Sequence, residues 1–397
     1  MSDSIMRWFA LALFLVGCGG ATQAVQPTTP GPTLRAQTQV ITPTDGATER
    51  ELLERGERAL MVQRWREAAD AFELLLEAKP SDAAMVATAT LDLGLAYQGL
   101  GEYAKARDAL ERRLAISDVG PDARIARNRL FAVLAYLEDW PALGAHAEKT
   151  LARQAPSGGR PGGETDLGPM DKMNALGARS LSRIEAGDDA GAERDLQSGL
   201  DIKEEQRYGN GGRLPGPAAQ LEFAQGEIRR TRSEKISFTP VGDDFLAKMN
   251  VRCQGLIDAQ ASYADAMRSD DPFWATISGY RVGQMYRAIH RDLMTIPPTA
   301  LAKSEKQKQI FFGIMHLRYR VLLEKGMEMM KRTYDFAVKN GDQQWVLRAT
   351  QGKHEMELSL EEEKAVIASF PFSEQEIQDA LKLMEQHYNE AQAKKKK

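Results

Sequence analysis

Apolar residues recur every three or four positions from residue 48 almost to the C-terminus, which is the period of an amphipathic helix. The periodic pattern starts where Thr48 and Glu51 have the spacing of a capping box. Two glycine-rich segments, 157–169 and 209–217, interrupt it. No stretch shows the strict alternation of apolar and polar residues that is typical of a half-buried strand. The pattern therefore predicts an all-α protein.

The helices between residues 48 and 235 repeat, and Gly56 and Gly94 mark a period of about 38 residues. The two best copies, 48–82 and 86–117, share small and aromatic residues at matching positions: Gly56, Trp65, Ala68, Phe72 and Pro80, then Gly94, Tyr97, Gly101, Tyr103, Ala106 and Leu110. These spacings are typical of the tetratricopeptide repeat. Two degenerate copies follow at 123–154 and 173–204. Because at least about three repeats are needed for a stable stack, the sequence predicts a tetratricopeptide-like helical-hairpin solenoid.

The first helix of each pair is expected to line the concave face of such a solenoid. The repeat register places nine candidate protein-binding residues there: Arg50, Leu53, Glu57, Met61, Leu91, Leu95, Gln98, Asn128 and Tyr136. A surface that mixes apolar and polar groups suits an extended peptide or a helix of another protein, with Met61, Leu95 and Tyr136 as anchors. Packing of these side chains against one another is the alternative.

A C-terminal helical domain is expected over residues 243–397, where the repeat spacing is lost and a lysine run ends the chain. Its most distinctive block runs from Asp271-Pro272-Phe273-Trp274 through Tyr280-Arg281-Val282-Gly283-Gln284-Met285-Tyr286 to Ile296-Pro297-Pro298 and Trp345. This block resembles the C-terminal helical region of large periplasmic tetratricopeptide proteins of myxobacteria, including those of the adventurous gliding-motility machinery. The resemblance implies an envelope scaffold in a larger membrane-associated assembly. Core packing is the alternative explanation for the aromatic residues.

The N-terminus predicts a lipoprotein signal peptide over residues 1–17. Arg7 precedes a nine-residue apolar run, and Gly17 stands before Cys18, which becomes the acylated N-terminus. An ordinary secretory signal with a chance cysteine is the alternative. Residues 18–47 are rich in Thr, Pro, Gly and Gln and predict a flexible tether. These features predict a lipid-anchored protein of the cell envelope, on the periplasmic face of the outer membrane.

Composition and motifs argue against several other classes of protein. The net charge of −4 gives no basic excess for nucleic acid, and Cys253 has no disulfide partner if Cys18 carries lipid. His290-Arg291-Asp292 spells the start of a kinase catalytic loop, but Pro297 stands where that loop needs a metal-binding asparagine. The histidines have no zinc-binding spacing, and Glu361-Glu362-Glu363 resembles a solvated helix face. No catalytic residue, metal, cofactor or small-molecule substrate is predicted.

The functional hypothesis is a non-catalytic envelope lipoprotein whose repeats bind another envelope protein in a multiprotein assembly. The resemblance implies motility as the process served. A pilotin-like assembly factor for a secretin or pilus is one alternative. An envelope enzyme with an unrecognised site between the repeat and C-terminal regions is another.

Overall fold

The computed structural model describes residues 48–153, 167–241, 244–298 and 304–395, which contain fourteen α-helices and no strand. The chain separates into two compact units, with the boundary between Gly211 and Gly212. We call residues 48–211 the repeat unit and residues 212–395 the C-terminal unit. The predicted all-α class is confirmed. The predicted signal peptide, Cys18, the tether and the last two lysines lie outside the described residues.

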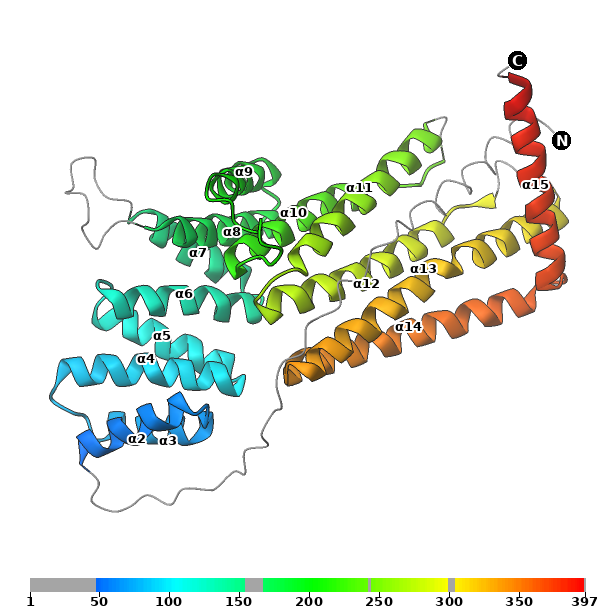
Figure 1. The fold of residues 1–397 in the computed structure, drawn as a ribbon. Helices are drawn as coiled ribbons and strands as arrows, with labels where there is room; N and C mark the ends of the chain where they lie inside the picture. Colours follow the sequence, from blue (N-terminus) through cyan, green and yellow to red (C-terminus); the bar gives the residue numbers. More distant parts are fainter. Residues whose placement is uncertain (1–47, 154–166, 242–243, 299–303, 396–397) are drawn as a thin grey trace. The chain divides into compact units, whose positions relative to one another are not determined.

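The repeat unit consists of four helical hairpins that stack in chain order, as Figure 1 shows from blue to green. Its helices are α2 (Glu49–Met61), α3 (Trp65–Glu77), α4 (Ala83–Leu100), α5 (Tyr103–Ile116), α6 (Pro121–Tyr136), α7 (Trp140–Leu151), α8 (Pro169–Glu185) and α9 (Asp189–Glu205). Each hairpin contacts the next one along the chain, so the unit has the predicted helical-hairpin, solenoid-like fold.

Small residues let the two helices of a hairpin approach closely. A Cβ atom added at Gly56 would overlap the ring of Phe72 on the facing helix, and one at Gly94 would come 2.9 Å from Leu110. The capping box at Thr48 is present, since Thr48 N donates to Glu51 Oε2 at 2.8 Å. The matching residues of the two best sequence repeats, Gly56 with Phe72 and Gly94 with Leu110, therefore lie inside the hairpins.

Aromatic residues join successive hairpins. Trp65 at the start of α3 covers Gly99 near the end of α4, where an added Cβ would overlap the indole ring. Tyr103 of α5 stacks on Tyr136 of α6 with ring centroids 4.2 Å apart. The apolar core that results runs from the first hairpin to α8 of the fourth.

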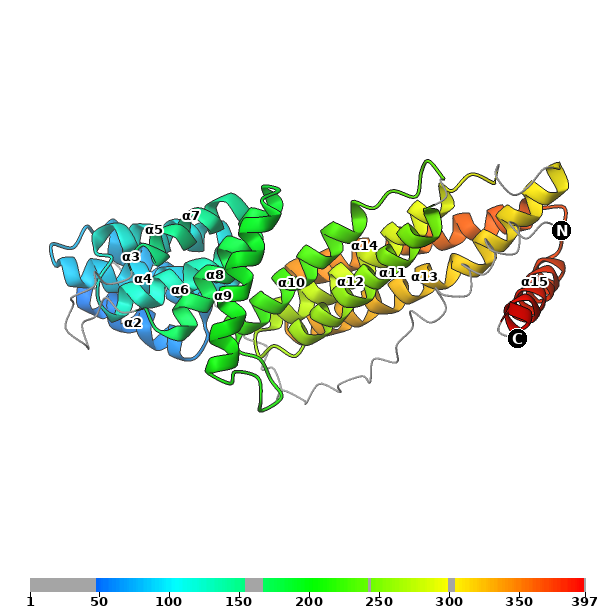
Figure 2. The same cartoon turned by 90° about the horizontal axis from the view of Figure 1, so that it is seen from above.

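The C-terminal unit is a bundle of long helices that run side by side, with α15 turning away at one end (Figure 2). Its helices are α10 (Gly216–Glu234), α11 (Phe245–Ala266), α12 (Pro272–Met294), α13 (Glu305–Lys339), α14 (Gln343–Ser369) and α15 (Glu374–Lys395). The sequence prediction ended the repeat region at residue 235, whereas α10 packs against α11 and α12 and belongs to this unit. No helix in the described parts of the chain is long and apolar enough to cross a membrane.

The distinctive aromatic block is part of the core of this bundle. Trp274 is 4% exposed and Trp345 is 1% exposed, so both act in packing. Met330 of α13 fits between Gly283 of α12 and Gly352 of α14, where added Cβ atoms would lie 2.7 and 2.8 Å from its side chain. Three helices therefore meet closely around one methionine.

A buried ionic network ties α10, α11 and α12 together. The carboxylate of Glu227 accepts hydrogen bonds from Tyr263 Oη at 2.7 Å, Arg230 Nη2 at 2.7 Å and Arg281 Nε at 3.0 Å. Burial alone would raise the pKa of Glu227, but the adjacent Arg281 and Arg230 guanidinium groups hold it below its usual value. Glu227 is therefore ionised inside the protein.

Candidate functional site

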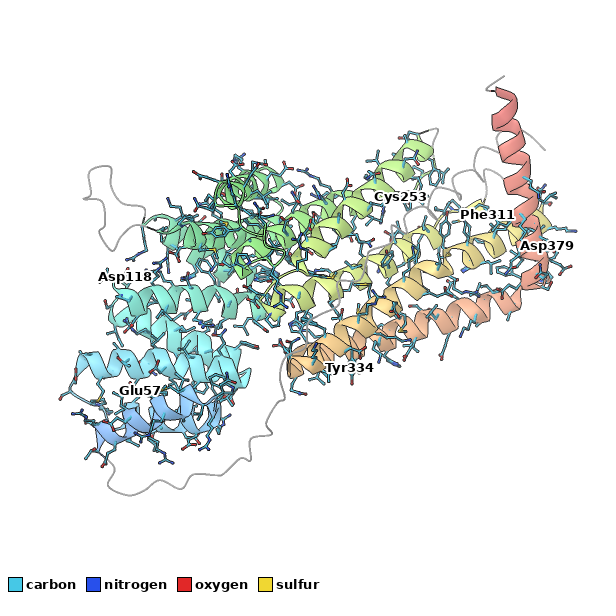
Figure 3. The ribbon with its side chains drawn as sticks, in the orientation of Figure 1. Glu57, Asp118, Cys253, Phe311, Tyr334 and Asp379 are labelled. Carbon is cyan, nitrogen blue, oxygen red and sulfur yellow. The ribbon has the colours of Figure 1, made fainter. Side chains whose placement is uncertain are left out.

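The first helices of the hairpins form one continuous layer, because α2 contacts α4, α4 contacts α6 and α6 contacts α8. We use the name first-helix face for the following side chains on this layer: Arg50, Leu53, Glu57, Met61, Asp92, Leu95, Gln98, Arg124, Asn128 and Tyr136. Figure 3 labels Glu57 on α2. The face is exposed or half-buried and combines apolar, acidic and basic groups.

Most of the candidate residues from the sequence are accessible on this face. Met61 is 84% exposed, and Arg50 is exposed and forms an ion pair with Glu54. Leu53, Glu57, Leu95, Gln98 and Asn128 are half-buried. Tyr136 is half-buried too, but its ring stacks on Tyr103 of the second helix α5. Leu53 packs on the core of the unit as well, so its side chain is shared between the face and the interior.

Leu91 is the exception and requires a correction. It is 5% exposed and belongs to the apolar core, whereas its neighbour Asp92 is half-buried on the face. Successive helical residues point about 100° apart, so an error of one position in the register exchanges a surface residue for a core residue. The repeat pattern therefore missed Asp92, the most perturbed acidic group of this face.

Asp92 lies at an electrostatically unfavourable place in the middle of the face. Burial, together with the nearby carboxylates of Glu57 on α2 and Asp122 on α6, raises the pKa of Asp92 to about 6. A charged Asp92 at neutral pH therefore destabilises the folded unit. Groups with strongly perturbed pKa values are concentrated at functional sites.

We expect Asp92→Asn to stabilise the repeat unit at pH 8 by about 1 to 3 kcal/mol, because the amide removes a disfavoured charge. The folded-state pKa of about 6 lies above the ordinary aspartate value of 3.8, so the gain is full above pH 6 and disappears as pH falls toward 4. Urea unfolding at pH 8 and pH 4.5 measures both effects. Asp108→Asn, at a side chain that is 66% exposed, is the matched control and should change stability by less than about 0.5 kcal/mol. An equal gain in both variants would contradict this account.

Polar contacts continue the face from the third to the fourth hairpin. Asn128 Nδ2 of α6 donates to Asp171 Oδ1 of α8 at 2.8 Å, and Arg124 Nη2 lies 2.7 Å from Asp171 Oδ2. Asp171 also accepts from the backbone N–H of Gly168 at 3.1 Å. Asn128 is thus engaged within the unit, and the neighbouring Arg124 is the more exposed of the two.

No protein-family model matches the chain, and no curated protein sequence matches it.

The motifs that suggest chemistry are engaged in structural contacts. In the kinase-like string, Asp292 accepts from Arg252 of α11 and His290 faces Glu363 of α14. His146 contacts the carbonyl oxygen of Arg127 at 3.0 Å, and burial lowers its pKa to about 4. In the parts of the chain that the structure describes, no three His, Cys, Asp or Glu side chains are placed to hold a metal ion.

A small apolar cavity lies between α11, α12 and α13. Cys253, which Figure 3 labels on α11, lines it together with Leu256, Ile257, Gln260, Met285, Tyr286, Ile289 and Leu322. Its volume of about 30 Å³ is close to that of one water molecule. The cavity is a packing gap between helices.

Proposed function

We propose that the chain is a non-catalytic lipoprotein of the cell envelope whose first-helix face binds another envelope protein. The observation that carries this proposal is the continuous face of α2, α4 and α6, with the half-buried Asp92 at its centre beside Glu57. A lysine or arginine of the partner would relieve the repulsion among these carboxylates. Met61 and Leu95 offer apolar contact on the same face.

The proposed anchor is an acyl group on Cys18, followed by the tether over residues 18–47. Anchoring confines the repeat unit near a membrane and raises the effective concentration of a partner in the same membrane. A modest affinity of the first-helix face is then sufficient to hold an assembly together. The outer membrane and a motility assembly are the proposed setting, on the basis of Gly19 after Cys18 and of the resemblance of the C-terminal block.

Site-specific photocrosslinking in intact cells tests the binding surface. We expect a photoreactive residue at Met61 or Gln98 to capture one discrete partner, whereas one at Arg112, an exposed residue of the second helix α5, captures none. Asp92→Asn should weaken the captured band while it stabilises the unit. Equal crosslinking from Arg112 would contradict the proposal.

The anchor is tested independently by metabolic labelling with a fatty acid. The wild-type chain should incorporate label and fractionate with the membrane, and Cys18→Ala should do neither. Labelling of Cys18→Ala at the wild-type level would refute lipidation at this residue. The photocrosslinking experiment tests the binding surface of the repeat unit, so its result can support or contradict partner binding whatever the labelling of Cys18 shows.

A further inference from the structure

Two imidazoles and one carboxylate form a buried cluster that joins three helices of the C-terminal unit. Glu363 of α14 has a side chain that is 7% exposed. Its Oε1 lies 3.2 Å from Nε2 of His290 on α12, and its Oε2 lies 2.8 Å from Nδ1 of His316 on α13. Each carboxylate oxygen therefore faces one imidazole. The proposed function uses none of these groups.

The cluster lies at the end of the bundle where α14 passes into α15. The ring of Phe370, which follows α14, is 6.1 Å from the ring of His316. Beyond this turn, Ile377 of α15 packs against Gly313 of α13, where an added Cβ would lie 2.8 Å from Ile377. Figure 2 shows that α15 then leaves the bundle. The cluster thus holds the segment that positions α15.

The charge of the cluster depends on how many protons it binds. Burial alone would raise the pKa of Glu363, but the facing imidazoles of His290 and His316 hold it at about 2, so this carboxylate stays ionised. With one protonated imidazole the cluster is electrically neutral. A second proton leaves a net positive charge inside the protein, which burial disfavours.

Other charged groups lie on the helices that carry the cluster or on helices that pack against them. They are Arg287 with Glu355, Arg252 with Asp292, Arg320 with Glu324 and Glu374, the buried Arg318 on α13, and the exposed Arg291, Glu361, Glu362 and Lys364. Imidazole is the side-chain group that ordinarily gains or loses a proton between pH 5 and 8, so we consider the two imidazoles of the cluster.

We propose that His290, Glu363 and His316 form a proton-operated tie that holds the end of α14, and with it α15, on the bundle at neutral pH and releases this end in acid. Release exposes both imidazoles to water, where each binds its own proton. The open form then carries one proton more than the closed form, so the opening equilibrium rises about tenfold for each pH unit below about pH 6.

Hydrogen exchange of the backbone amides in residues 363–383, corrected for the intrinsic effect of pH, tests the release. The wild-type chain should open about tenfold more at pH 5 than at pH 6. His316→Gln leaves one imidazole for one carboxylate, so the neutral closed cluster and the open form bind the same number of protons. The opening of this segment should then no longer depend on pH. His354 on α14 is the internal control, since its side chain is 69% exposed and lies outside the cluster. His354→Gln should keep the wild-type dependence.

Glu363→Gln should make the opening depend more steeply on pH, in contrast to His316→Gln. Without the carboxylate, neither imidazole of the closed cluster has a negative charge to stabilise its proton. The opening equilibrium should then rise about a hundredfold for each pH unit. If this variant fails to fold, His316→Gln remains decisive, because its side chain is at the edge of the cluster and 15% exposed. Exchange that is independent of pH in the wild type, or unchanged in His316→Gln, would overturn the proposal.

Discussion

Glu227→Ala is expected to destabilise the C-terminal unit by about 3 to 5 kcal/mol, because it removes the buried carboxylate that Arg281, Arg230 and the buried Tyr263 hydroxyl share and leaves Arg230 only its ion pair with Glu234. Glu227 accepts from Arg230, Arg281 and Tyr263, which come from three different helices. Its lowered pKa contributes stability that is full above about pH 4.5 and is lost as pH falls through the folded-state value. Hydrogen exchange of the α10–α12 amides in urea measures the loss in this unit separately from the repeat unit.

The matched control for this prediction is Glu234→Ala. Glu234 is on the same helix and pairs with Arg230, but its side chain is 31% exposed. We expect a loss of less than about 1 kcal/mol there. Replacing Glu227, Arg230 and Arg281 together by Leu, Met and Met should recover part of the stability, since it removes the buried carboxylate and its two half-buried partners but leaves the Tyr263 hydroxyl without its acceptor. Equal losses in Glu227→Ala and Glu234→Ala would show that the network does not stabilise the unit.

Trp345→Ala is expected to cost about 3 to 5 kcal/mol through the cavity that it leaves in the bundle. Trp345 is 1% exposed, and its ring lies 5.6 Å from Tyr280 and 6.1 Å from Phe273, both on α12. The substitution therefore removes the contact between the start of α14 and α12. Exchange of the α12 and α14 amides should rise together.

Leu347→Ala, two residues further along α14, is the control for the cavity. Leu347 is 71% exposed, so its truncation should change stability by less than about 0.5 kcal/mol. Trp345→Phe should give an intermediate loss, because it retains part of the apolar volume. A loss for Trp345→Ala no greater than that for Leu347→Ala would mean that the aromatic block has another role.

The sequence predicts those parts of the fold that depend on contacts local in the chain. The capping box at Thr48 and the close approach at Gly56 and Gly94 are determined by residue types within one hairpin, and the structure has them as expected. The end of the repeat region was harder to predict, because α10 has apolar residues on several faces and fits either unit. Only its contacts with α11 and α12 assign it to the C-terminal unit.

Candidate site residues were less predictable because burial of a charge depends on partners from distant helices. Glu363 belongs to an acidic run that resembles a solvated face, and Glu361 and Glu362 are indeed exposed. Glu363 itself is 5% exposed because His290 and His316 from two other helices face it. Likewise, the repeat register was wrong by one residue on α4: it predicted Leu91 on the surface, whereas Leu91 is in the core and Asp92 is on the face. Periodicity gives the approximate face of a helix but not its exact rotation.

The position of Met330 between Gly283 and Gly352 limits how the C-terminal helices can slide. A shift of α13 by one turn, about 5.4 Å, would move this side chain away from Gly352 and onto Arg348 or Met356 of α14, whereas on α12 another glycine, Gly279, lies one turn from Gly283. The steric barrier to axial displacement of α13 is therefore on α14. Mechanical load applied along α13 would be transmitted to α14 at this point.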